Sequence, residues 1–152
     1  MKMMQRLEDF LSILLMEELR RKVKTGALNV VLTNEDDAEI GRFSFNPVDL
    51  NIIRRYEEVV ANLEKMEVPE DATEKDILEL SDRLEEQIDY LLNSKASKSV
   101  FAICNPLTLT ESGDFFIENI IVEIADVIEQ VTDQRIKKKQ AKIKRATSKY
   151  HK

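Results

Sequence analysis

Apolar residues recur every three or four positions in four separate stretches of this 152-residue chain, at about residues 3–24, 46–66, 73–93 and 114–131. This spacing is typical of amphipathic helices. The chain has only three glycines and three prolines, which is too few for the many turns of a β-sandwich. The sequence therefore predicts a mainly helical protein.

The apolar pattern changes from helical to alternating between the first two predicted helices. Leu28, Val30 and Leu32 alternate with their neighbours, residues 34–37 form a polar turn sequence, and residues 38–45 form a second candidate strand. This pattern predicts a β-hairpin at about residues 28–45. The expected fold class is therefore α+β, mainly α with one small β-hairpin, with four main helices in the order helix, hairpin, helices.

Short local sequences predict where these helices begin and end. Gly26 is expected as the C-cap of the first helix. Asn46 and Pro47 are expected as the N-cap and the first residue of the second helix. Thr73 and Asp76 have the spacing of a capping box at the start of the third helix.

The net charge of -6 conceals a division of the chain into two parts. Nine of the 23 lysines and arginines follow Gln134, whereas none of the 29 acidic residues does. The sequence therefore predicts an acidic helical domain over residues 1–134, which contains the hairpin, and a basic C-terminal helical extension or tail over residues 135–152.

The basic extension supplies the candidate partner-binding residues. They are Arg135, Lys137, Lys138, Lys139, Lys142, Lys144, Arg145 and Lys149. Such residues can neutralise phosphates in a salt-dependent and sequence-independent way.

Tyr150 is the extension's single aromatic residue, so the sequence offers no stacking platform for single strands, and the acidic domain repels nucleic acid. Nucleic acid is therefore not the favoured partner, and a solvated helix end that contacts an acidic surface is the simpler interpretation. A small nucleic-acid-binding or regulatory protein stays the alternative function.

Catalytic groups are scarce in this sequence. The single cysteine, Cys104, has an apolar context, and the single histidine, His151, is next to last in the chain, although a nucleophilic cysteine needs a positioned base. A buried structural thiol and a reducing cytoplasm are the expectation. The three glycines stand apart from one another, and the acidic residues 35–37 lack the spacing of a calcium loop. We therefore expect no catalytic, cofactor-binding or metal site and no enzymatic activity; an enzyme that uses surface carboxylates is the weakest option.

Neither apolar-rich stretch predicts a membrane segment. The run over residues 11–16 is short, and the stretch over residues 115–128 contains three acidic residues. A bilayer-spanning helix needs about 20 consecutive, predominantly apolar residues. No membrane partner is expected.

The order of several short motifs resembles the tail assembly chaperones of long-tailed bacteriophages and prophages of Firmicutes. The motifs are Phe43-Ser44-Phe45-Asn46-Pro47-Val48-Asp49, Glu86-Gln87-Ile88-Asp89, Val100-Phe101, Cys104-Asn105-Pro106-Leu107, Phe115-Phe116-Ile117-Glu118 and Ser148-Lys149-Tyr150. The resemblance covers about Leu28 to Lys152.

This resemblance implies a non-enzymatic role in tail morphogenesis. Such chaperones bind the tape measure protein, a very long and largely helical chain, keep it soluble and help to recruit tail tube subunits. They act in the host bacterial cytoplasm and are absent from the mature virion. Many are made in two lengths by programmed ribosomal frameshifting, and the Lys137-Lys138 pair is compatible with A-rich slippery codons.

The chain departs from the family pattern at its front. The helix expected over residues 3–24 precedes the hairpin as an addition, and its role and the oligomeric state stay open. Self-association is one option, because the opposite charges of domain and extension can arrange head-to-tail contacts that build open arrays. The apolar stripes of the third helix and of the helix after residue 114 can line a groove for a helical client.

Overall fold

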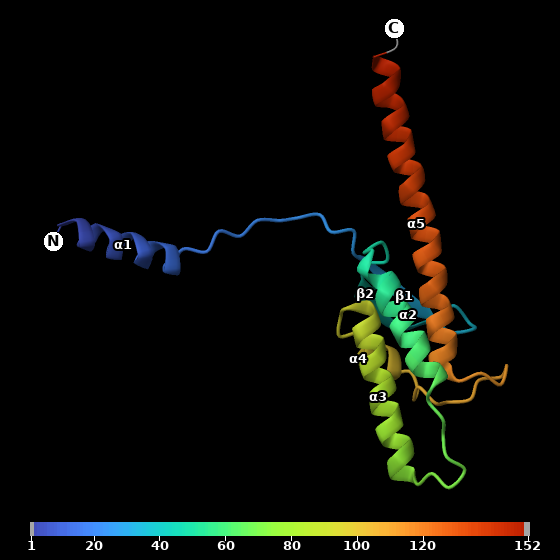
Figure 1. Cartoon of the computed structure of the whole chain (residues 1–152). Coiled ribbons are helices and arrows are strands. Elements are labelled where there is room, and N and C mark those ends of the chain that lie inside the picture. The colour runs from blue at the N-terminus through green and yellow to red at the C-terminus, as the bar shows by residue number, and fades with distance from the viewer. Residues whose placement is uncertain (1, 151–152) are drawn as a thin grey trace.

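The computed structural model describes residues 2–150 (Figure 1). In this part of the chain it contains five helices and one two-stranded hairpin. The elements are α1 (Lys2–Met16), β1 (Leu28–Thr33), β2 (Glu39–Phe45), α2 (Asn51–Glu64), α3 (Glu74–Leu92), α4 (Ser97–Phe101) and α5 (Phe116–Lys149). The predicted mainly helical fold with one β-hairpin is confirmed, and the predicted count of four main helices is matched roughly. Met1, His151 and Lys152 lie outside the described residues.

The hairpin forms where the alternating pattern predicts it. β1 and β2 pair antiparallel, with Leu28 opposite Phe45 and Val30 opposite Phe43. The Asn34 Oδ1 atom accepts hydrogen bonds from the backbone N–H groups of Asp36 and Ala38, at 2.9 and 3.1 Å, and this holds the turn. The rings of Phe43 and Phe45 are both buried, as expected for residues two apart on one strand face.

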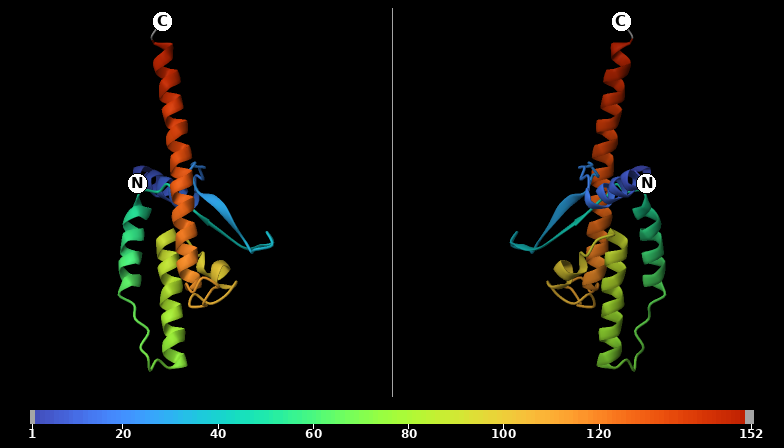
Figure 2. Two further views of the ribbon diagram at one scale, coloured as in Figure 1. Left: turned by 90° about the vertical axis from the view of Figure 1, so that its right-hand side faces the viewer. Right: turned by 90° about the vertical axis from the view of Figure 1, so that its left-hand side faces the viewer.

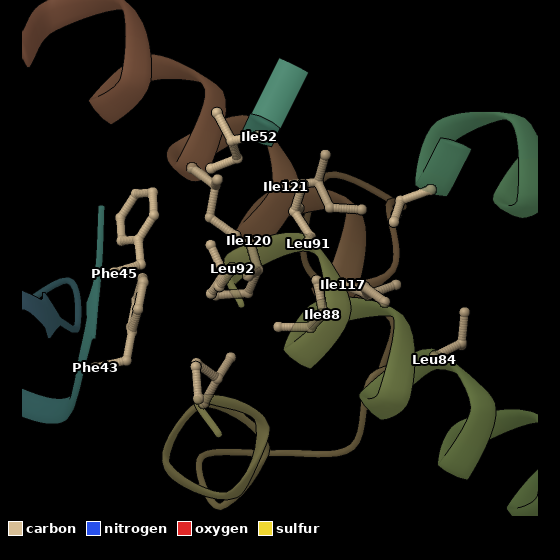
Figure 3. Packing of buried hydrophobic residues seen from close by; sticks show 14 residues of the cluster. Phe43, Phe45, Ile52, Leu84, Ile88, Leu91, Leu92, Ile117, Ile120 and Ile121 are labelled. Atoms are coloured by element: carbon tan, nitrogen blue, oxygen red, sulfur yellow. The ribbon is translucent and has the colours of Figure 1, made fainter. Parts of the chain in front are cut away.

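These two rings dock the hairpin on the helices. The core is a cluster of buried apolar residues that come from β2, all the helices after it and the residue before α4 (Figure 3): Phe43, Phe45, Ile52, Val59, Leu84, Ile88, Leu91, Leu92, Ala96, Val100, Ile117, Ile120, Ile121 and Ile124. A two-stranded hairpin is marginal in water, so the docking of its apolar face is what keeps it folded.

Side-chain caps fix the ends of α3 and the start of α4. The Thr73 hydroxyl accepts from the Asp76 N–H at 3.2 Å and the Asp76 carboxylate accepts from the Thr73 N–H at 3.1 Å, so the predicted capping box is confirmed. Asn93 ends α3 in a left-handed conformation. The Asp89 carboxylate then accepts from the N–H and the hydroxyl of Ser97, both at 2.8 Å, at the first residue of α4.

The first helix is shorter than the prediction of residues 3–24. α1 ends at Met16, and residues 17–27 have no regular structure. Four of the five residues over 20–24 are basic, and like charges three or four positions apart destabilise a helix that nothing packs against. The prediction of Gly26 as a helix C-cap was therefore wrong. Gly26 does have a positive φ, +91°, but it lies in an irregular segment ten residues beyond the end of α1.

The second predicted helix begins later than expected, at Asn51 rather than at Pro47. Asn46 is not its N-cap, because the Asn46 Nδ2 group donates to the Thr25 carbonyl at 2.7 Å and its Oδ1 atom accepts from the Val48 N–H at 3.3 Å. The Asp49 carboxylate instead accepts from the Asn51 N–H at 3.0 Å, at the first turn of α2.

The last helix, α5, is one continuous element of 34 residues, about 51 Å long at 1.5 Å per residue. Its buried residues lie between Ile117 and Ile124. Its second half projects beyond the rest of the molecule in every view (Figures 1 and 2). The predicted boundary between the acidic domain and the basic extension, after residue 134, falls inside this helix. The division of the chain into these two parts stays a prediction.

Candidate functional site

An apolar groove lies between α2, α3 and α5. Its larger hollow has a volume of about 500 Å³. The apolar side chains that line it are Tyr56, Val60, Leu63, Met66, Val68, Leu80, Leu84, Leu107, Phe115, Ile117 and Ile121. A second hollow of about 400 Å³, lined by Ile52, Ile53, Tyr56, Ala125 and Ile128, continues it between α2 and α5. Tyr56 lines both hollows, and we name the two together the α2–α5 groove.

The charged residues along this groove are all acidic. Glu64 and Glu118 line the larger hollow, and Glu57 and Glu129 line the smaller one. No lysine or arginine is among the residues that line either hollow. Charges at the rim of an interface act mainly on specificity and on the rate of association. The groove therefore favours an apolar partner that carries basic rather than acidic flanks.

The groove has the dimensions of a helix-binding surface. Along α2 it extends from Ile52 to Leu63, and along α5 from Ile117 to Ile128. Each of these intervals contains twelve residues, so its eleven steps rise about 17 Å. An amphipathic helix of three turns presents an apolar stripe of that length, and such helices dock into apolar grooves through residues spaced by three and four.

A second uncovered apolar surface is one side of α1, which we name the α1 face. It consists of Met3, Met4, Leu7, Phe10, Leu11 and Leu14, all between 55 and 76% exposed. Figure 1 shows α1 well clear of the rest of the molecule, at the end of the extended segment over residues 17–27. Contiguous apolar patches on soluble proteins mark interaction sites.

The predicted partner-binding residues of the basic extension divide into two groups. Lys137, Lys138, Lys139, Lys142, Lys144, Arg145 and Lys149 are exposed on the projecting half of α5, and we name residues 137–149 the basic arm. Within residues 2–150 none of them forms an ion pair, so the arm does not contact the acidic body of its own chain.

Arg135 differs from the other predicted binding residues because it is half-buried. Its guanidinium lies against Gly26: a methyl group added at that glycine would be 2.5 Å from the Arg135 Nη1 atom. The Asn46 side chain borders the same position and holds the Thr25 carbonyl. Arg135 thus joins α5 to the chain just before β1 and has a structural role that its sequence context does not reveal.

The candidate chemical residues do not assemble into a catalytic site. The acidic residues 35–37 are exposed in the hairpin turn, and Cys104 is half-buried rather than fully buried as predicted. Burial raises the pKa of the Glu85 carboxyl, and the neighbouring Asp82 and Asp89 raise it further. Among the described residues no group of three or more His, Cys, Asp and Glu side chains is arranged to hold a metal ion.

The sequence predicts that the third helix and the last long helix line the groove, but it does not predict that α2 lines it as well. The signal was present in two pairs of adjacent apolar residues, Ile52-Ile53 and Val59-Val60. In each pair the first residue is buried in the core, while the second lines the groove with part of its surface exposed. An apolar stripe two residues wide thus serves the core and an outer surface at once.

No helix among residues 2–150 combines the length and the apolar character that crossing a bilayer requires. No family model matches the chain, and the chain has no match among curated proteins or solved structures.

Proposed function

We propose that this protein is a phage tail assembly chaperone that binds the tape measure protein and helps to recruit tail tube subunits. The α2–α5 groove is the observation that carries the proposal. A largely helical client exposes amphipathic helices before it is enclosed, and an open apolar groove about 17 Å long accepts one such helix. The order of the sequence motifs over residues 28–152 supports the same assignment by resemblance.

The proposed role is non-enzymatic and needs no cofactor. Binding a client helix removes its apolar stripe from water and so prevents the client from aggregating. We expect the protein in the cytoplasm of the infected bacterium during assembly, and we expect it to be missing from the finished particle.

Co-expression with the tape measure protein of the same genome tests the proposal. The full chain should keep that client soluble and co-purify with it. Ile53→Glu places a charge in the groove at a side chain that is already 56% exposed, so the fold should tolerate it while capture is lost. Ala61→Glu adds the same charge at an exposed position of α2 that does not line the groove, and it should capture normally.

Two results would contradict this assignment. The first is a wild-type chain that leaves the tape measure protein insoluble. The second is equal capture by the Ile53→Glu and Ala61→Glu variants, which would remove the groove from the mechanism. Intact-mass measurement of the products made from the gene with its native downstream DNA adds an independent check. A minor product that shares the N-terminus but continues in another frame would support the chaperone.

The basic arm favours one alternative function, nucleic-acid binding. Its exposed lysines are unpaired within residues 2–150. This alternative predicts binding to arbitrary DNA that weakens steeply as salt rises and that disappears in a chain ending at Ile136. Fluorescence anisotropy with a labelled duplex at several salt concentrations distinguishes it from the chaperone, which should bind DNA weakly.

A further inference from the structure

We propose that the α1 face docks in the α2–α5 groove of a second copy of this chain, so that copies associate head to tail. The inference rests on the groove being a helix-binding surface, as in the proposed function, but it does not depend on which client the groove serves. It concerns the chain on its own, before any client is bound.

The first support is that α1 needs a partner to be stable. Isolated helices of about 15 residues are marginal in water, and most helical stability in proteins comes from packing of an apolar face. α1 has no acidic residue in its first turn and no basic residue in its last, so favourable charges at its ends do not substitute for packing. Its apolar side nevertheless faces solvent in a single copy.

The second support is a match of length and charge. The α1 face extends from Met3 to Leu14, a rise of about 17 Å, which equals the length of the groove along α2 and along α5. The segment over residues 2–24 holds six basic and four acidic residues. Within α1 itself two basic residues balance two acidic ones, and the excess of basic residues lies on the flanking residues 17–24, which hold four basic and two acidic residues. The groove is lined by four glutamates and by no basic residue, so the charge complementarity falls on this flank of the helix.

The third support concerns which groove α1 can reach. Thr25 is held against the body by Asn46, whose Nδ2 group donates to the Thr25 carbonyl at 2.7 Å, and Gly26 lies beside the Arg135 guanidinium. From there the segment leads α1 away from the body (Figure 1). Residues 17–25 contain neither glycine nor proline, the residues that would favour a reversal of the chain. In this arrangement α1 lies away from its own groove, with its apolar side open to a second copy.

Such a contact is heterologous, because a helix of one copy meets a groove of the next. A pair joined by one such contact retains one free groove and one free α1 face, so it can add further copies.

Sedimentation velocity of the full chain over a wide range of concentrations tests this inference. The wild type should exceed the 17.6 kDa mass of one chain and grow with concentration. The double variant Leu7→Glu/Leu11→Glu, on the exposed α1 face, should weaken self-association about tenfold or more. Its control, Gln5→Lys/Ser12→Lys, adds two charges to the polar side of α1 at positions four residues from Asp9 and Glu8, where they do not weaken the helix, and it should not lose association.

Mixing gives the sharpest result. The Leu7→Glu/Leu11→Glu variant keeps its groove, and the Ile53→Glu variant keeps its α1 face. Each should be monomeric alone, whereas a mixture should form one-to-one pairs that grow no further, because only one intact contact is available.

Three outcomes would overturn the inference. They are a wild type that is monomeric at every concentration, a mixture of the two variants that forms no pairs, and self-association that survives the α1 substitutions but disappears when the chain ends at Ile136. The last would assign self-association to the charges of the basic arm. None of these outcomes bears on the proposed function, because Leu7→Glu/Leu11→Glu should still capture the tape measure protein in its intact groove.

Discussion

At the scale of single residues, Arg55 is a charged side chain buried at the edge of the core. It is only 8% exposed. Its Nε donates to the Leu91 carbonyl at 3.1 Å, and its Nη2 reaches the Asp49 carboxylate at 3.4 Å. The pKa of Asp49 is lowered, first by the hydrogen bond from the Asn51 N–H and then by Arg55. One guanidinium thus ties the start of α2 to the end of α3.

Arg55→Ala should lower the free energy of unfolding by about 2–3 kcal/mol, because it leaves the Leu91 carbonyl and a partly buried carboxylate without their charged donor. Arg55→Lys should recover only part of this loss, because an ammonium group lacks the planar fork that serves two acceptors. Urea denaturation followed by circular dichroism measures both. Equal stability of Arg55→Ala and wild type would show that the pair is not needed.

Glu85 gives a pH dependence of known sign. Its pKa is raised above the usual 4.5 by burial and by Asp82 and Asp89, so the folded chain binds its proton more tightly than the unfolded chain. Stability contributed by this group therefore falls as pH rises through 4.5 and stays lower above its folded pKa. Glu85→Gln should stabilise the protein at neutral pH by about 0.5 kcal/mol.

The advantage of Glu85→Gln should vanish below pH 4.5, where the wild-type carboxyl is also neutral. Thermal unfolding at several pH values tests this. Glu86→Gln is the matched control, because Glu86 is exposed on the same helix. It should change the stability less than Glu85→Gln does. A constant difference between Glu85→Gln and wild type at all pH values would contradict the assignment.

At the scale of elements, the sequence predicts best what local interactions decide. The hairpin and α3 lie where they were predicted, because the alternation of β1, the turn at Asn34 and the capping box at Thr73 act within a few residues. The predicted end of α1 and the predicted start of α2 were wrong. Asn46 is diverted from its predicted capping role by Thr25, twenty-one residues earlier in the chain, and no local pattern reveals such a partner.

The groove was predicted only in part for the same reason. The periodicity of a helix shows that it has an apolar side, but not how far apart its neighbours will lie. Tyr56 illustrates this, because it lies on the apolar side of α2, where a core residue is expected, yet it lines both hollows. Only the placement of α2 relative to α5 decides between these roles.

Gly26 and Gly113 allow a test of how α5 is joined to the start of β1. Both have positive φ, +91° and +86°, so an alanine costs about 1–2 kcal/mol at either position from backbone strain. A methyl group at Gly113 meets nothing within 4 Å, whereas one at Gly26 must displace the Arg135 guanidinium. Because the guanidinium is the end of a flexible side chain that can move aside, Gly26→Ala should be only slightly more destabilising than Gly113→Ala in chemical denaturation; equal losses would show that the Arg135 contact adds nothing.

At the scale of the whole molecule, the structure has a packed body and two projections, α1 and the basic arm (Figure 1). The body buries its apolar side chains, while the projections expose apolar residues at one end of the chain and basic residues at the other. The α2–α5 groove adds a third exposed surface on the body itself, so the groove alone is shared between the core and a partner.

A chain that ends at Ile136 should have nearly the same free energy of unfolding as the full chain, within about 0.5 kcal/mol, because residues 137–149 are exposed. A chain that ends at Gln134 also lacks Arg135 and its contact with Gly26, and it should be less stable. Comparison of the two by urea denaturation checks the prediction. Marked destabilisation of the chain that ends at Ile136 would mean that the arm supports the body.

The continuity of α5 also fixes the angular position of the arm. Because a helix turns by about 100° and advances 1.5 Å with each residue, the direction in which each lysine points is set relative to the groove by the count of residues between them. Inserting one residue after Val131 would rotate the entire arm by about 100°, whereas inserting seven would return it to within about 20° of its original bearing. A partner that touches both the groove and the arm would therefore respond to the phase of the helix as well as to its length.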